Sequence, residues 1–179
     1  MTQRRQVGPH FIRFLLGHFA EPLRSVRPPP NFCAQLVAKA PSAELSEALA
    51  AAFERADMLL RAGTGTLAAR LHEAAISRIL IATMQLRLRD LIALDLALHF
   101  ERDGEGLIRR IHLSPREASS PIGIDIPLHE HLSKAMERHL RTFRPLLPGA
   151  DRTTRLLIGS SERGMTMREL RAHLRLLGL

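Results

Sequence analysis

The sequence of 179 residues contains no tyrosine, no tryptophan and a single cysteine, Cys33. A lone cysteine has no partner within the chain, so we expect no disulfide framework and a reducing, cytoplasmic environment. The lack of tyrosine means that no residue of this sequence can serve as a tyrosine nucleophile. No cluster of Cys and His residues indicates a structural zinc site, and we predict neither a metal nor a cofactor.

Long apolar runs are also missing. The longest apolar stretches are interrupted by charged residues well before the roughly 18 residues that a membrane helix needs. Near the N-terminus, Arg13 breaks an apolar run and no small-residue cleavage site follows, so we expect no signal peptide. A chain of this length can bury one core plus a small appendage. The expectation is a soluble, cytoplasmic protein without membrane contact.

The basic residues exceed the acidic ones and are nearly all of one kind. The formal net charge is +8, and Lys39 and Lys134 are the only lysines, so the positive charge is carried by arginine. The guanidinium group presents a planar fork of donors that matches phosphate oxygens. This composition indicates an inclination toward nucleic acid. A GC-rich coding bias would produce the same enrichment, so charge alone does not decide the partner.

Two regions differ in composition. Residues 1–41 predict an irregular segment or linker, because prolines recur there too often for a long helix. These prolines are Pro22, Pro28, Pro29, Pro30 and Pro41. Residues 42–179 carry regular hydrophobic periods and predict one domain.

The first part of this domain has a helical period. Apolar residues recur every three or four positions from Ser42, a suitable N-cap, to a pair of glycines that ends the first helix. A second helix is expected over residues 66–85 and a third over residues 87–100. The turn-forming pair Asp103 and Gly104 is expected to stop the third helix.

The period then changes to two, which predicts an antiparallel β-hairpin. The first strand covers residues 107–113, the loop residues 114–120, and the second strand ends at Pro127. Leu107, Arg109, Ile111 and Leu113 are expected to share one face of the first strand. On the second, Ile122, Ile124 and Ile126 alternate with Gly123 and Asp125.

A helical period returns after the hairpin. It runs from Leu132 to Phe143 and is broken by Pro145, and a last helix begins at Thr166, which forms a capping box with Glu169. The predicted fold class is mainly α with a small antiparallel β-hairpin (α+β).

Three histidines invite a functional interpretation. His129 and His131 flank an acid at a helix start, but no third ligand completes a metal site, so we interpret them as capping or solvated side chains. His173 lies between apolar positions of the last helix, and we interpret it as packing on the flank of that helix.

The order of these elements carries a family resemblance. Arg87-Leu88-Arg89-Asp90-Leu91 resembles the "arginine, two residues, acid, leucine" box of the tyrosine recombinase (phage integrase) family, in which the arginine opens a helix. Residues 124–128 resemble the strand that ends in Pro-Leu, and residues 139–147 the helix end followed by Arg-Pro. Residues 156–166 resemble the loop and helix start that precede the active-site helix. The resemblance covers residues 44–179, the first two thirds of that catalytic domain.

The resemblance implies chemistry on DNA. In that family a tyrosine attacks a phosphodiester to form a covalent phosphotyrosine, while preorganised cationic side chains stabilise the charge that develops on the phosphate. Arg87 would be the first phosphate-clamping arginine. Asp90 lies one helical turn further on and would hold that guanidinium in place. The implied partner is double-stranded DNA, with a homo-oligomer on DNA as a further expectation.

This sequence departs from the family pattern at three points. The tyrosine is missing, and so is the His-x-x-Arg box that would follow the helix of residues 166–177. Ser119 stands where the family has a lysine in the hairpin loop. Arg116 is nearby, but a group with a pKa above about 12 is a poor general acid. Whether the chain is an enzyme stays open, and we expect a truncated domain that cannot cut DNA alone.

Three hypotheses follow from these observations. The first is a DNA-binding fragment of a site-specific recombinase or integrase, of the kind that mobile elements use for DNA integration. The second is a non-catalytic, helical DNA-binding regulator of the same ancestry. The third is a protein-interaction module whose arginines only solvate its surface. Under the first two, the candidate DNA-binding residues besides Arg87 are Arg89, Arg109, Arg110 and Arg116.

Overall fold

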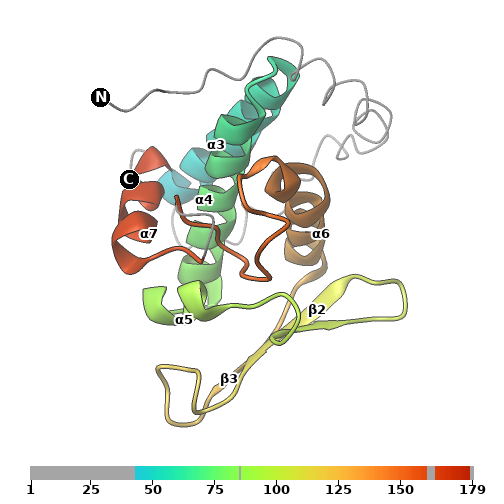
Figure 1. Ribbon diagram of the computed structural model, residues 1–179, viewed down its shortest axis with the longest axis vertical. Helices are drawn as coiled ribbons and strands as arrows, with labels where there is room; N and C mark the ends of the chain where they lie inside the picture. Colours follow the sequence, from blue (N-terminus) through green and yellow to red (C-terminus); the bar gives the residue numbers. More distant parts are fainter. Residues whose placement is uncertain (1–42, 85, 161–163, 178–179) are drawn as a thin grey trace.

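A computed structural model describes residues 43–84, 86–160 and 164–177 (Figure 1). The described chain is mainly helical with a small antiparallel sheet, so the predicted α+β class is confirmed. The predicted irregular segment, residues 1–41, and the predicted cap Ser42 lie outside the described residues. Within the described ranges, no helix combines the length and the apolarity that crossing a membrane requires.

Helices α3 (Ala43–Arg61) and α4 (Gly65–Met84) form a hairpin at the centre of the structure. Gly63 ends α3 in the left-handed region, with φ +78°, a conformation that glycine adopts without steric penalty. The middle of α4 is buried on nearly all sides because α3, α5, α7 and the segment after α6 pack around it. Both predicted helices are confirmed.

The third helix, predicted over residues 87–100, is present only in its first part, and the prediction is wrong for the rest. Helix α5 spans only Leu88–Ala93. After it, polar side chains bind the backbone: the Nδ1 atom of His99 accepts from the Asp95 amide at 2.9 Å, and the Asp95 carboxylate accepts from the Ala97 amide at 3.0 Å. Such local side-chain hydrogen bonds compete with helical ones and end the helix.

The residues expected at the end of that helix form a strand instead. The sheet has the order β1-β2-β3, with β1 (Phe100–Arg102), β2 (Ile108–Leu113) and β3 (Ile124–Pro127). The predicted hairpin is therefore the β2-β3 part of a three-stranded antiparallel sheet. Asp103 and Gly104 connect β1 to β2 rather than stopping a helix.

A β-bulge changes the face that β2 presents to the core. Arg102 lies opposite Ile108 and Glu101 opposite Arg110, which leaves Arg109 without a partner on β1. An extra residue shifts the alternation of a strand by one position. Ile108 is therefore buried. Of the four residues predicted to share one face, Ile111 and Leu113 are buried, whereas Leu107 and Arg109 are half-buried.

The second predicted strand is shorter than expected. In β3, Ile124 and Ile126 are half-buried, as their alternation predicts, and Pro127 ends the strand. Ile122 precedes β3 and is 88% exposed, so the strand does not include this first residue of the predicted alternation.

Helix α6 (Glu130–Arg138) continues as a π-helical turn, η1 (His139–Phe143), and a 3-10 turn, η2 (Arg144–Leu146). Helical turns of these three kinds therefore pass through Pro145 to Leu146, although the α-helix itself already ends at Arg138, earlier than predicted. The π-helical turn places the Phe143 ring against His72 of α4, with ring centroids 4.0 Å apart.

The chain then runs without long helices or strands to α7 (Met167–Leu174) and the 3-10 turn η3 (Arg175–Leu177). The Arg144 guanidinium holds this segment by donating to the carbonyl oxygens of Ala150 and Arg155, at 2.9 and 3.0 Å. The predicted capping box of Thr166 and Glu169 is present and starts α7, which packs on α4 and α5.

Candidate nucleic-acid interface

Arg87 stands at the N-terminus of α5, beside the loop between β2 and β3. Its backbone is extended, and its side chain is exposed. The Nη1 atom lies 3.5 Å from the carbonyl oxygen of Ser119 in that loop. The structure therefore brings Arg87 and Ser119 together, two residues that the sequence places 32 positions apart.

Asp90 binds the loop rather than Arg87. Its carboxylate is buried and accepts two hydrogen bonds from Ser119, one from the amide and one from the hydroxyl, both at 2.6 Å. No ion pair links Asp90 to Arg87, although the structure describes both side chains. Asp90 was expected to bind the Arg87 guanidinium directly. Instead it binds Ser119, whose carbonyl oxygen lies near Arg87.

A second contact anchors the same loop. Glu117 accepts from the Ser114 hydroxyl at 2.5 Å and lies 3.3 Å from the Nε2 atom of His99. Because Nδ1 of His99 accepts from a backbone amide, its proton is on Nε2 and points to Glu117. These hydrogen bonds, that of Ser114 foremost, lower the pKa of Glu117 to about 2.

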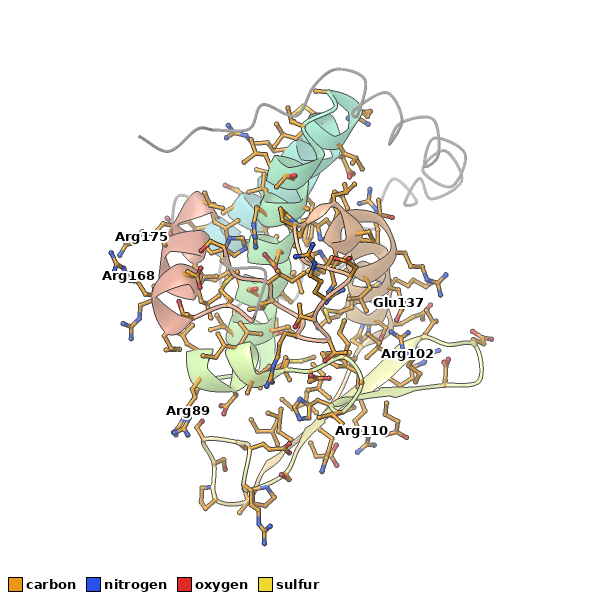
Figure 2. The ribbon with its side chains drawn as sticks, in the orientation of Figure 1. Arg89, Arg102, Arg110, Glu137, Arg168 and Arg175 are labelled. Atoms are coloured by element: carbon orange, nitrogen blue, oxygen red, sulfur yellow. The ribbon has the colours of Figure 1, made fainter. Side chains whose placement is uncertain are left out.

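Exposed arginines gather on α5 and on the neighbouring helix α7. On α7 and the η3 turn that follows it they recur at positions i, i+3 and i+7, on the side opposite the buried residues Leu170 and His173. Figure 2 shows Arg168 and Arg175 pointing away from the body of the protein. We call this set the α5–α7 arginine face; its members are Arg87, Arg89, Arg168, Arg171 and Arg175.

No member of this face forms an ion pair with a carboxylate in the described part of the chain. Arg116, in the β2-β3 loop, is exposed and likewise has no carboxylate partner among these residues. The face therefore presents to solvent positive charge that no carboxylate of residues 43–84, 86–160 and 164–177 pairs with.

The arginines of the sheet differ in this respect. Arg109 donates to Asp103 at 2.5 Å and lowers the pKa of that carboxyl. Arg110 pairs with Asp125 at 2.8 Å and lies 3.6 Å from Glu101. The two sheet residues that the sequence analysis proposed for DNA contact thus carry carboxylate partners, unlike Arg89 and Arg116.

Sequence reasoning did not single out the three arginines of α7. A signal was available, because Arg168, Arg171 and Arg175 repeat with helical spacing after a confirmed capping box. The sequence does not reveal that α7 packs on α5, and this packing is what brings the helix with these arginines next to the helix that carries Arg89.

A buried polar cluster holds α7 in place. His173, expected on the flank of the helix, is buried, and its Nε2 atom lies 3.3 Å from Oε2 of Glu73 on α4. Glu73 also accepts from Arg70 and from the amide of Ile158, both at 3.0 Å. The cluster connects α4, α7 and the preceding segment; Glu73 and His173 are buried within it, and Arg70 is half-buried.

Burial controls the charge states in this cluster. Removal from water raises the pKa of Glu73 to about 7, because desolvation of the carboxylate outweighs the attraction of Arg70. Burial lowers the pKa of His173 to about 4, so this imidazole is neutral near neutral pH. The cluster thus lies where α7, the helix that carries Arg168 and Arg171, packs on α4.

The histidines at the start of α6 form no metal site. The His129 side chain accepts from the amide of His131, which confirms the capping interpretation of His129. Across residues 43–84, 86–160 and 164–177, no three His, Cys, Asp or Glu side chains are arranged to hold a metal ion.

Comparisons of the chain with protein-family models, with curated proteins and with solved structures found no match. The resemblance to the tyrosine recombinases, and the function that it implies, therefore stay predictions.

Proposed function

We propose that this protein binds double-stranded DNA through the α5–α7 arginine face, with Arg116 of the β2-β3 loop as a further contact. The observation that carries the proposal is the contrast between two sets of arginines. Those of the sheet are paired with carboxylates, whereas the five of the face are exposed and have none among the described residues.

Duplex DNA suits this surface better than an acidic protein does. Each guanidinium can bind two phosphate oxygens at once, and a row of such groups follows a repeating phosphate backbone. Unpaired arginines on adjacent elements are the electrostatic footprint that nucleic-acid-binding proteins share. The face also lies beside an anchored loop, so a bound duplex would meet preordered groups.

We further propose that the domain is integrase-like and serves as the DNA-binding part of a site-specific recombinase. The order of the motifs supports this, as does the contact of Arg87 with the loop residue at the lysine position. This sequence has no tyrosine, so strand cleavage by the phosphotyrosine route of that family would need a nucleophile from outside these residues.

The salt dependence of DNA binding tests the proposal. We would measure the dissociation constant for a fluorescent duplex by anisotropy over a salt series, for the wild type, the double variant Arg168→Ala/Arg171→Ala and the control Arg110→Ala. Each lost phosphate contact should reduce the slope of log K against log salt by about 0.9. We expect a loss of about two units of slope for the double variant and little change for the control, whose guanidinium is already paired.

Two results would contradict the proposal. Wild-type protein whose DNA binding is weak and independent of salt would favour the protein-interaction hypothesis. Equal salt slopes for all three proteins would show that Arg168 and Arg171 of α7 do not contact the phosphates.

A further inference from the structure

The loop between β2 and β3 ends in an apolar tip. Ile122 is 88% exposed, more than any other large hydrophobic residue in the described chain, and Pro121 beside it is exposed too. Figure 1 shows this loop extending beyond the helical body, below α5. An isolated exposed isoleucine is common on protein surfaces and by itself indicates nothing. Its setting here is what suggests a function.

The backbone around Ile122 holds it in one direction. The Gly123 amide donates to the Ser120 carbonyl at 3.2 Å, which closes a tight turn with Pro121 and Ile122 at its centre. Proline restricts φ at the first central position. Gly123 has φ +75°, and a Cβ atom there would lie 2.7 Å from the Leu113 carbonyl oxygen, so only glycine fits.

The base of the loop is anchored as firmly as its tip. Ser119 is held by the two hydrogen bonds to Asp90, and Glu117 by Ser114 and His99. A loop that is already ordered loses little conformational entropy when it enters a binding partner. The apolar tip is therefore presented on a preorganised support.

The charges around the tip favour a polyanion. Glu117 is the only carboxylate between residues 114 and 123, and it faces Ser114 and His99. Arg116 is exposed in the same loop, and Arg87 contacts the Ser119 carbonyl. The loop thus combines an apolar tip with one arginine in its own sequence and another at its base. Apolar wedges together with cations are the pairing used by proteins that insert isoleucine, leucine or proline between base pairs.

We infer that Ile122, supported by Pro121, is a wedge that enters a base step from the minor-groove side of the duplex. The inference rests on the proposed function, because the arginine face would bring the duplex to the loop. Partial unstacking at the wedge would bend the DNA and increase its contact with the protein. Pyrimidine–purine steps such as TA, which unstack most easily, are the expected sites.

The test uses the full chain and a TA-rich duplex that carries 2-aminopurine, a base whose fluorescence rises when it is unstacked. The proteins are the wild type, Ile122→Ser, and Met58→Ser as a control, since Met58 is an exposed hydrophobic residue on α3. Fluorescence, affinity, its salt slope and the oligomeric state of each protein are measured.

We expect the wild type and Met58→Ser to increase the 2-aminopurine signal, and Ile122→Ser to abolish the increase. Loss of one buried aliphatic side chain should weaken affinity by about tenfold. The salt slope should stay unchanged because no phosphate contact is lost.

Three results would overturn the wedge. If Ile122→Ser keeps wild-type fluorescence and affinity, the tip does not enter the duplex, while DNA binding itself stands. If the variant loses self-association instead, Ile122 contacts a second copy of the chain. If the wild type shows no salt-dependent DNA binding, the proposed function fails and the wedge fails with it.

Discussion

The carboxylate of Asp90 on α5 accepts both hydrogen bonds that Ser119 of the β2-β3 loop donates, each at 2.6 Å. These two bonds join a helix and a loop that are 29 residues apart in the chain. They also place the Ser119 carbonyl beside Arg87. Asp90 is therefore one of the two carboxylates that anchor the loop carrying the apolar tip, the other being Glu117.

Replacing Asp90 with alanine should destabilise the protein. The variant leaves two Ser119 donors without their acceptor, and such a loss costs about 1–3 kcal/mol of unfolding free energy. Urea unfolding measures the change, and faster hydrogen exchange at the Ser119 amide would locate it. Asp125→Ala is the matched control, because Asp125 and its partner Arg110 are both exposed and such pairs contribute under about 1 kcal/mol. Equal losses in the two variants would show that the Asp90 contact is unimportant.

Replacing Arg87 with alanine should weaken DNA binding without unfolding the domain. The side chain is exposed and makes only a long contact, 3.5 Å, to the Ser119 carbonyl. The thermal midpoint should therefore match that of the wild type while the anisotropy-derived affinity falls. Arg55→Ala removes an exposed arginine from α3 and should leave affinity nearly unchanged. Unchanged affinity together with unchanged stability in Arg87→Ala would remove this residue from the interface.

The buried carboxyl of Glu73 should make stability depend on pH. Its pKa is raised from 4.5 to about 7 in the folded protein, so the folded state binds the proton more tightly than the unfolded state does. The resulting stabilisation is fully present below the unfolded pKa and is lost as pH rises through about 7. A difference of one pKa unit corresponds to about 1.4 kcal/mol.

Comparison of the wild type with Glu73→Gln isolates this effect from the histidines. The buried imidazoles of His139 and His173 have lowered pKa values and act in the opposite direction, losing stability as pH falls below their usual range. Between about pH 5 and about pH 8 the unfolding free energy of the wild type should fall by about 2–3 kcal/mol relative to that of the glutamine variant. Glu54→Gln, on the exposed side of α3, should show no such trend. A constant difference for Glu73→Gln would mean that Glu73 is ionised throughout this range.

Several local features could be predicted from the residues because their causes are local. The helices α3 and α4 follow from a regular apolar period, and the start of α7 from the Thr166 and Glu169 capping box. The β2-β3 hairpin follows from alternation of period two. In each case neighbouring side chains and backbone groups supply most of the determining interactions.

Other features could not be predicted, because their causes lie far along the chain. Residues 100–102 continue a helical pattern in the sequence but pair with β2, and the unmatched Arg109 shifts the inward face of that strand. The candidate site changed for the same reason. Arg109 and Arg110 stand out in the sequence as cations, but the carboxylates that neutralise them lie on neighbouring strands and turns.

The sequence by itself determined the kind of charge, the helical periods, the capping of α7 and the lack of a tyrosine. Only the tertiary structure decided which arginines keep their charge free for a partner, that Asp90 holds Ser119, and that His173 meets Glu73 inside the protein. The physical reason is that ion pairing and desolvation depend on distances of a few ångströms between residues far apart in the chain. Folding sets those distances, and local propensity does not.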